Sequence, residues 1–229
     1  MFSYFGSKSK FIDYYPPPVH NTVIEPFAGS ARYACRYFDR DVWINDLDPR
    51  IYGIWKWIQN ATRDDVRNLP ELQRGESTKS LELPDAVRDL LGFAVAHGNA
   101  QPTYTVTEWA ARGSIRNLKH NLLQIVGQID HWRITNKSYS ELDNVTASWY
   151  IDPPYQHMGN YYKCGPSGIN FAELGKWCQS RKGQVMVCEG TGADWLPFKP
   201  MIRRRRVRRK DLYEELIWYK SDKTIGLVY

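Results

Sequence analysis

The sequence has few cysteines, and their spacing excludes the common cysteine-based sites. The four are Cys35, Cys164, Cys178 and Cys188, and they form no CxxC pair and no His/Cys cluster with zinc spacing. Scattered thiols of this kind are typical of reduced core residues in a cytoplasmic protein. We therefore expect neither a disulfide framework nor a bound metal.

Long apolar runs are also missing. No stretch is long enough to cross a bilayer, and the first ten residues lack the charged-then-apolar pattern of a secretory signal. We therefore expect a soluble cytoplasmic protein with no membrane partner. The 229 residues, of which 42% are hydrophobic and 24% charged, suit one globular α/β domain with a small inserted lobe.

Positive charge is concentrated in one segment. The net charge is +6, and residues 203–210 read RRRRVRRK, which places seven cations within eight positions. Without them the chain would be slightly acidic. Such a run fits a solvated basic strand, but its density favours a polyanion partner bound through phosphate contacts.

Short apolar runs alternate with helical patterns along the chain. Strands are predicted at residues 23–25, 42–46, 132–135, 147–151 and 184–188, and helices at 32–40, 50–60, 114–129 and 171–181. This alternation predicts a doubly wound, mostly parallel α/β sheet. Asp48 is the expected N-cap of the second helix, with Pro49 at its first position. Residues 203–220 are expected to form a final hairpin with 224–229.

Residues 61–112 differ from the rest. They are polar, with short helices predicted at 64–68 and 85–93, and we interpret them as an inserted region. The insert separates an N-terminal part of the α/β domain, residues 1–60, from a C-terminal part, residues 113–229.

Three predicted strand ends carry residues suited to binding. Ligands of open α/β sheets lie beyond the carboxyl ends of the strands. The first end is the segment Glu25-Pro26-Phe27-Ala28-Gly29-Ser30, where the glycine lets the backbone approach a ligand. The second is Asp46, about 20 residues later, where a carboxylate can accept hydrogen bonds from the ribose of an adenosine-containing cofactor. Capping of the next helix is the alternative for Asp46, although Asp48 suits that role better.

The third strand end is the tetrapeptide Asp152-Pro153-Pro154-Tyr155. Alone, it also fits an ordinary proline turn at an edge strand. Both prolines restrict the backbone and lack an N–H, which presents the neighbouring carbonyls in a stiff turn. A carboxylate oxygen and such a carbonyl can together accept both hydrogens of an amino group, and a tyrosine ring can stack on a planar base. Together the three ends suggest methyl transfer from S-adenosylmethionine to an amine.

The chain resembles the alpha-group, Dam-like DNA adenine N(6)-methyltransferases. The similar segments are the opening at residues 4–8, the loop at 25–31, the strand end at 45–48, the tetrapeptide at 152–155 and the basic stretch with its following strand at 203–220. The family's loop ends in glycine where this chain has Ala31, and its opening has a second glycine where this chain has Ser7. The recognition segment of members that read GATC is absent, which leaves the recognition sequence open.

The resemblance implies a Rossmann-like methyltransferase fold with S-adenosyl-L-methionine as cofactor, double-stranded DNA as partner, no metal, and the insert as a DNA-recognition region. The residues it implies for the cofactor are Tyr4, Lys8, Glu25, Phe27, Ala28, Gly29, Ser30, Asp46, Leu47 and Asp152. The implied catalytic residues are Asp152, Pro153, Pro154 and Tyr155, acting on an adenine flipped out of the duplex. Phosphate contacts are expected from Arg203, Arg204, Arg205, Arg206, Arg208, Arg209 and Lys210, with Arg112, Arg116 and Lys119 as weaker candidates.

Two alternatives stay open at this point. The same amine-holding chemistry serves an RNA base, cytosine or a protein glutamine, although the basic run argues against a protein substrate. A DNA-binding relative that has lost catalysis is the other alternative, and the intact tetrapeptide and Asp46 argue against it.

Overall fold

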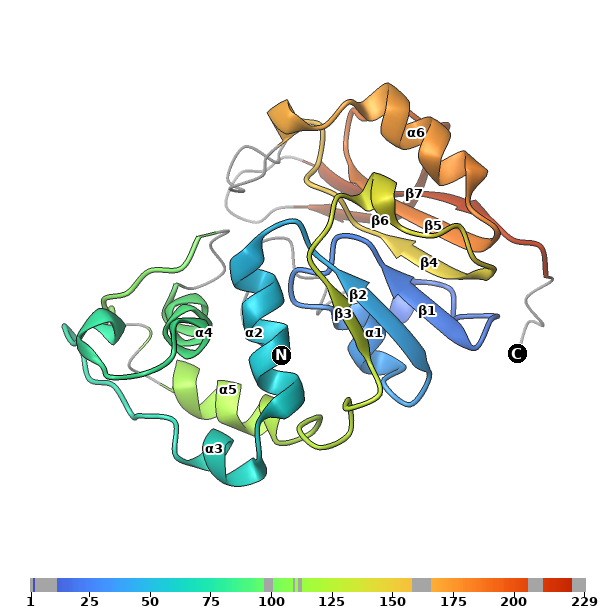
Figure 1. The fold of residues 1–229 in the computed structure, drawn as a ribbon. Coiled ribbons are helices and arrows are strands. Elements are labelled where there is room, and N and C mark those ends of the chain that lie inside the picture. The colour runs from blue at the N-terminus through green and yellow to red at the C-terminus, as the bar shows by residue number, and fades with distance from the viewer. Residues whose placement is uncertain are drawn as a thin grey trace.

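The computed structural model describes residues 2, 12–96, 101–108, 110, 113–157, 166–205 and 212–223. Its centre is a seven-stranded sheet in the order β3-β2-β1-β4-β5-β7-β6 (Figure 1). The strands from β3 to β5 in this order are parallel, and β7 runs antiparallel to both β5 and β6. The predicted doubly wound, mostly parallel α/β sheet is confirmed.

The elements follow the predicted alternation. The strands are β1 (Thr22–Glu25), β2 (Asp41–Asn45), β3 (Arg133–Thr135), β4 (Ala147–Ile151), β5 (Gly183–Gly190), β6 (Lys199–Arg205) and β7 (Leu212–Lys220). The α-helices are α1 (Arg32–Arg36), α2 (Pro49–Asn60), α3 (Arg63–Arg67), α4 (Asp85–Val95), α5 (Ser114–Leu122) and α6 (Phe171–Ser180). Short 3-10 turns include η1 (Ile12–Tyr14), η2 (Thr78–Ser80) and η4 (Tyr139–Glu141).

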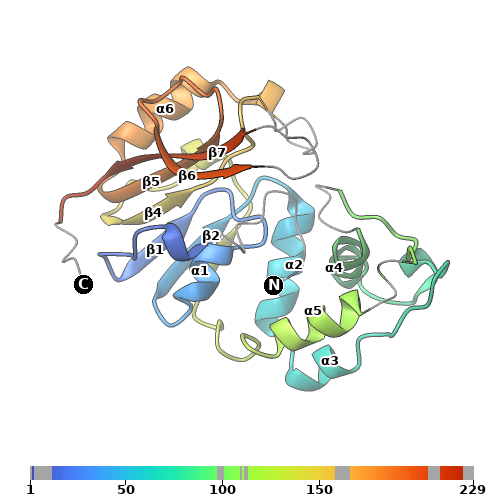
Figure 2. The ribbon, with the colours of Figure 1, turned by 180° about the vertical axis from the view of Figure 1, so that it is seen from behind.

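The sheet separates two apolar clusters. Because side chains alternate along a strand, Trp149 of β4 packs in one cluster with α6, and Tyr150 packs in the other with α1 and α2. Figures 1 and 2 show α6 on one face of the sheet and α1 and α2 on the other, with α4 and α5 beyond α2. The core thus has three layers, and the helices α3, α4 and α5 extend one of them into a lobe.

Helix α2 shows why the local pattern was predictive. Asp48 is its N-cap and accepts a hydrogen bond from the Arg50 N–H, and Pro49 occupies the first helical position. Its buried side chains recur at helical spacing: Ile51, Ile54, Trp55 and Ile58. Both predictions for this helix are confirmed.

Two predicted helices are shorter in the structure. Helix α1 ends at Arg36, and α5 ends at Leu122 instead of residue 129. Beyond Leu122 the hydrogen bonds tighten, as between the Ile125 N–H and the Leu122 carbonyl, and Gly127 with φ of 77° breaks the helical path. Ile125, Val126 and Ile129 are nevertheless buried, so the apolar spacing continues through turns.

The predicted final hairpin needs correction. Strand β7 pairs with β6 on one side and with β5 on the other, so both of its edges are occupied. The hairpin therefore lies within residues 199–220, and residues 224–229 lie outside the described part of the chain.

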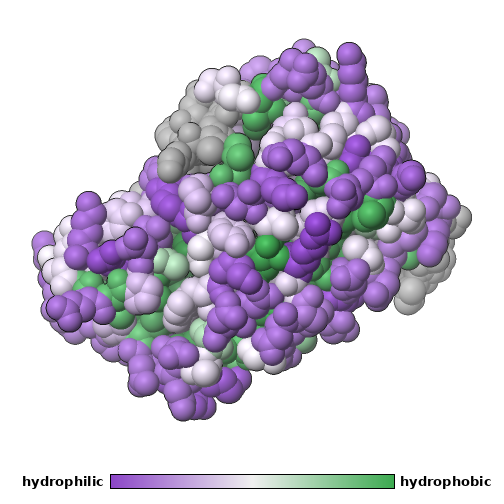
Figure 3. All heavy atoms as spheres, viewed as in Figure 1, coloured by the Kyte–Doolittle hydropathy of each residue, from purple (hydrophilic) through white to green (hydrophobic). Residues whose placement is uncertain are grey.

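Among the described residues, Cys35, Cys178 and Cys188 take part in no disulfide, and Cys164 lies outside the described residues. Within the described ranges, no helix has the length and apolar character needed to cross a membrane. Hydrophilic side chains cover most of the face seen in Figure 3, where apolar ones show only in small separate groups.

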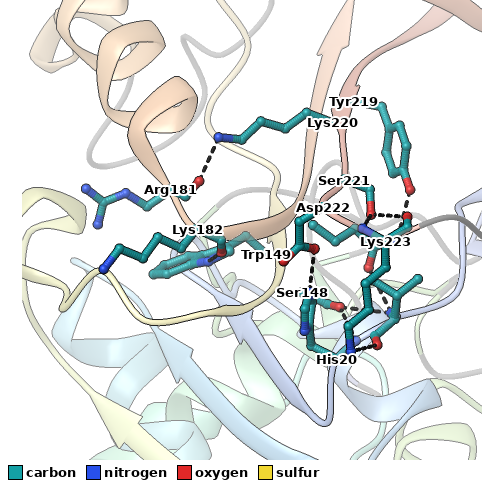
Figure 4. A network of polar contacts seen from close by, with 12 residues as sticks. His20, Ser148, Trp149, Arg181, Lys182, Tyr219, Lys220, Ser221, Asp222 and Lys223 are labelled. Atoms are coloured by element: carbon teal, nitrogen blue, oxygen red, sulfur yellow. Dashed lines mark hydrogen bonds and ion pairs between the residues drawn. The ribbon is translucent and has the colours of Figure 1, made fainter.

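A polar network closes the amino-terminal edge of the sheet (Figure 4). The buried Ser148 Oγ accepts hydrogen bonds from the Val19 and His20 N–H groups at 3.0 and 3.1 Å. The His20 ring contacts Asp222 at 2.8 Å, just after β7. The Gln184 side chain also joins Val19 through its oxygen, at 3.1 Å. This network fixes the chain that enters β1 at the edge opposite to the predicted site.

Candidate active site

The site lies where the order of the sheet reverses. Strands β1 and β4 are parallel neighbours, but the chain leaves β1 toward β2 and β3 before it returns to β4 on the other side. A reversal of this kind opens a crevice beyond the carboxyl ends of the two strands. The register aligns Ile24 with Trp149, so the loop after β1 and the tetrapeptide after β4 emerge at the same edge.

The loop after β1, residues 26–31, is held by β2 and α2. The Ala28 N–H donates to the Asn45 carbonyl at 2.9 Å, and the Asn45 side-chain amide donates to the Pro26 carbonyl at 3.0 Å. The Trp55 indole N–H donates to the Gly29 carbonyl at 2.9 Å. These bonds pin the backbone from both sides and leave its shape little freedom.

The end of this loop adopts a backbone conformation that favours glycine. Ala31 has φ of 43° and ψ of 48°, and it is the one non-glycine residue with positive φ among the described residues. A side chain in this left-handed region costs about 1–2 kcal/mol. The geometry explains why a glycine at this position, as in the resembled family, suits the loop.

Asp46 is tied to the loop by its carboxylate. Its Oδ2 accepts a hydrogen bond from the Gly29 N–H at 2.9 Å, and its Oδ1 accepts one from the Asp48 N–H at 2.9 Å. Burial raises the pKa of Asp46 to about 6, although both hydrogen bonds act to lower it. Since a carboxylate oxygen has two lone pairs, each oxygen can accept one further bond. Leu47, next in sequence, is 53% exposed and offers an apolar surface beside it.

Sequence reasoning missed a residue that shapes this corner. The Asn136 side-chain amide donates to the carbonyls of Asp46 and Leu47 at 2.7 and 3.1 Å. Asn136 follows β3 directly, at the carboxyl end of a strand next to β2. A polar residue just after the predicted strand 132–135 was the available signal.

Three other residues predicted for the cofactor site, Glu25, Phe27 and Ser30, are packed within the fold. Glu25 is buried and accepts a hydrogen bond from the Ala34 N–H at the start of α1, and burial raises its pKa well above the ordinary value. Phe27 packs against the Tyr139 ring at 5.4 Å on the α6 side of the sheet, and Ser30 is buried. Glu25 therefore stabilises the helix behind the loop, and its contact with a cofactor stays a prediction.

The tetrapeptide is anchored at its last residue. The Tyr155 side chain is 9% exposed, and its hydroxyl donates to Glu215 Oε1 at 2.6 Å. The Tyr15 hydroxyl donates to the same oxygen at 2.7 Å. Asp152 is half-buried at the exit of β4, and Pro153 is buried. Neither Tyr15 nor Glu215 was predicted from the sequence.

A second buried carboxylate holds the chain beyond the tetrapeptide. Glu189, at the end of β5, accepts hydrogen bonds from the Gln156 N–H at 2.9 Å and from the Trp195 indole N–H at 3.0 Å. Burial raises the pKa of Glu189, and the nearby Asp152 charge adds to that rise. The tetrapeptide is therefore fixed to both β5 and β7.

The predicted DNA contacts are only partly within the described residues. Arg203, Arg204 and Arg205 belong to the edge strand β6, of which the backbone is described. Outside the described residues lie Tyr4, Lys8, Arg112, Arg206, Arg208, Arg209 and Lys210. On α5, Arg116 is exposed, whereas Lys119 pairs with Glu71 at 2.8 Å.

Comparison with known families agrees with this geometry. Residues 4–83 match the family model described as D12 class N6 adenine-specific DNA methyltransferase. The predicted resemblance to the DNA adenine methyltransferases is confirmed over this stretch. No curated protein matches the chain.

The D12 match contains the loop after β1, Asp46 and Leu47, and it supports DNA adenine methylation as the general activity, with DNA as substrate. The tetrapeptide and the β6–β7 hairpin lie beyond the matched residues, so their likeness to the methyltransferases depends on the residues themselves. Over the described ranges, no group of three or more His, Cys, Asp and Glu residues is arranged to hold a metal ion.

Proposed function

We propose that this protein transfers the methyl group of S-adenosylmethionine to the exocyclic amino nitrogen of adenine in double-stranded DNA. The observation that carries the proposal is that two candidate binding segments lie at the same edge of the sheet. The loop after β1, tied to Asp46, and the tetrapeptide at Asp152 emerge from neighbouring parallel strands. The D12 match over residues 4–83 supports the same class of reaction.

The residues around the loop fit an adenosine-containing cofactor. Asp46 retains acceptor capacity for ribose hydroxyls after its two backbone bonds, and the exposed Leu47 can pack against the adenine ring. Gly29 presents backbone without a side chain. S-adenosylmethionine supplies an electrophilic methyl group on a positively charged sulfur.

The tetrapeptide acts on the target base. An adenine inside the duplex is out of reach and must be flipped out, at a cost of a few kcal/mol. Asp152 and the Pro153 carbonyl would accept hydrogen bonds from the two amino hydrogens, which would free the nitrogen lone pair for attack. The nitrogen would release one of these two protons once it carries the methyl group. Tyr155, whose ring is fixed through Glu215, stacks on the base. Holding the amine at this place supplies much of the rate by orientation.

The basic hairpin and the lobe supply the DNA contacts in this proposal. Residues 203–210 contact phosphates, which gives affinity and register but no sequence choice. The region 61–112 contributes to recognition. Binding should weaken steeply as salt rises.

The decisive experiment is methyl transfer from labelled S-adenosylmethionine to unmethylated duplex DNA, with nucleoside analysis of the product. N6-methyladenine is the expected product, and a duplex of poly(dG)·poly(dC) is the control that should take up no label. Label in RNA alone, in cytosine or in protein would refute the assigned substrate.

Asp152→Ala separates the enzyme from a silent DNA-binding relative. The variant should lose transfer by at least about 100-fold, since both geometry and polarisation of the amine depend on the carboxylate. Its affinity for DNA should stay close to that of the wild type in a fluorescence anisotropy titration. Transfer at the wild-type rate would remove Asp152 from the mechanism.

A further inference from the structure

Glu215 joins three segments that are far apart in the sequence. It lies on β7 opposite Gly190, at the carboxyl end of β5, and is fully buried. Its Oε1 accepts hydrogen bonds from the hydroxyl groups of Tyr155 and Tyr15, with oxygen–oxygen distances of 2.6 and 2.7 Å. One oxygen thus connects the tetrapeptide, the strand β7 and the segment that precedes β1.

Both hydrogen bonds are of the strong kind. Hydrogen bonds from a phenol to a carboxylate are charge-assisted, and the two distances lie in the short range typical of them. Burial raises the pKa of both Tyr15 and Tyr155 well above the ordinary value, and the Glu215 charge adds to the rise. Both hydroxyls therefore stay protonated and act as donors throughout the pH range of an assay.

The surrounding rings restrict movement further. The Tyr15 ring meets the Tyr150 ring edge-on at 5.1 Å, and the Tyr150 ring stacks on Tyr33 at 4.6 Å with an interplanar angle of 3°. Tyr150 belongs to β4, two residues before Asp152. The hydroxyl of Tyr155 is thus held at a point that is itself packed against the strand carrying Asp152.

We infer that Glu215 is a positioning residue for methyl transfer. It fixes the Tyr155 ring relative to Asp152, and Tyr15 fixes the Glu215 carboxylate. The inference rests on the proposed function, because the ring is assigned to stack on the flipped base. Glu215 touches neither cofactor nor base in this scheme and acts through Tyr155.

The test measures kcat and the KM for S-adenosylmethionine in three variants on unmethylated duplex DNA. Tyr155→Phe keeps the stacking ring and removes its tie, and we expect kcat to fall about 10-fold, because small misplacements of a reacting group are costly. Glu215→Ala should lower kcat about 10- to 100-fold, while Glu215→Gln, whose amide oxygen still accepts, should restore most of it. The KM for the cofactor should stay within about twofold, since the residues assigned to the cofactor, apart from Asp152, belong to β1, β2 and the segments next to them and do not contact Glu215 through any of the hydrogen bonds described above.

A double variant shows whether the two residues act together. Tyr155→Phe combined with Glu215→Ala should be no slower than Glu215→Ala alone, because both changes remove the same hydrogen bond. Tyr219→Phe removes a phenol hydroxyl from the other end of β7, where it contacts Gln184, and should leave kcat unchanged. Thermal unfolding of each variant shows whether it is folded. If Glu215→Ala is not, Tyr155→Phe carries the test, and Glu215→Gln is the variant expected to stay close to the wild type.

The outcomes separate the inference from the proposed function. A wild-type protein that transfers no methyl group refutes the proposed function and this inference with it. An active wild type whose kcat is unchanged in Tyr155→Phe and in a folded Glu215→Ala refutes the inference alone, and an unchanged kcat in Tyr155→Phe does so where Glu215→Ala is unfolded. Losses that appear only in the KM for the cofactor, or that simply add in the double variant, refute it as well.

Discussion

Replacement of Asp46 by asparagine tests whether this carboxylate binds the cofactor or only shapes the loop. Asp46 accepts one backbone N–H on each oxygen, from Gly29 and from Asp48. Asparagine keeps the size and one acceptor oxygen but loses the charge, and its amide nitrogen must face one of the two N–H groups. The change therefore removes the charge and one of the two backbone hydrogen bonds while it keeps the size of the side chain.

The size of the effect on stability follows from the pKa of about 6 that burial gives Asp46. A pKa raised by about 2 units means that ionising this group costs the folded protein about 3 kcal/mol. Protonation of Asp46 thus stabilises the fold fully below about pH 4, and this stabilisation is lost as the pH rises through about 6. In Asp46→Asn, stability should change less between pH 4 and pH 6.

Cofactor binding should show the opposite trend. The ionised carboxylate accepts the ribose hydroxyls, and each charge-assisted bond is worth about 1.5–3 kcal/mol. At pH 5 only about a tenth of Asp46 is ionised, so the affinity of the wild type for S-adenosylmethionine should fall about tenfold between pH 7 and pH 5. Asp46→Asn should bind about 10- to 100-fold more weakly at pH 7, with no such pH dependence.

Isothermal titration of S-adenosylmethionine into DNA-free protein, from pH 5 to pH 8, measures the pH dependence of the wild-type affinity and the weaker binding of Asp46→Asn. Asp130→Asn is the matched control, because Asp130 is exposed and precedes β3 at the opposite edge of the sheet. Wild-type affinity that is constant across this range, or an Asp46→Asn variant that binds as tightly as the wild type, would show that Asp46 only shapes the loop.

Two further predictions concern stability. Ser148→Ala removes the buried acceptor of the His20 N–H at the amino-terminal edge and should lower the free energy of unfolding by about 1–3 kcal/mol, measured by urea denaturation. Asp48→Ala removes the N-cap of α2 and should cost about 1 kcal/mol, with the exposed Asp143→Ala as a control that changes less.

The site residues that the sequence predicts are those that end a predicted strand or directly follow one. Glu25, Asp46 and Asp152 each follow or end an apolar run, and parallel strands bring their carboxyl ends to one edge. Asn136 also directly follows a strand, but asparagine after a strand is a common turn residue, so its identity alone does not indicate a site.

The Glu215 contacts lie beyond such reasoning. Tyr15 and Tyr155 are 200 and 60 residues from Glu215, and they meet it because β7 inserts antiparallel between β5 and β6. The local pattern of residues 203–220 predicted strand structure but not its partners, and the expected pairing with 224–229 was wrong for that reason. Strand order beyond the parallel part is set by packing of the whole sheet, which a short segment does not record.

The carboxyl edge of the sheet gathers carboxyl groups whose ionisation is costly because they are buried. Glu25, Asp46 and Glu189 all have raised pKa values with burial as the main cause, and the Asp152 charge contributes to the rise at Glu25 and Glu189. A fold that tolerates this cost is stabilised by any cation bound among these groups. The sulfonium of S-adenosylmethionine carries such a charge at the atom that donates the methyl group. In the proposed function, a cation bound there would promote ionisation of these carboxyl groups, and the resulting charges would favour the sulfonium cofactor over a neutral nucleoside of similar size.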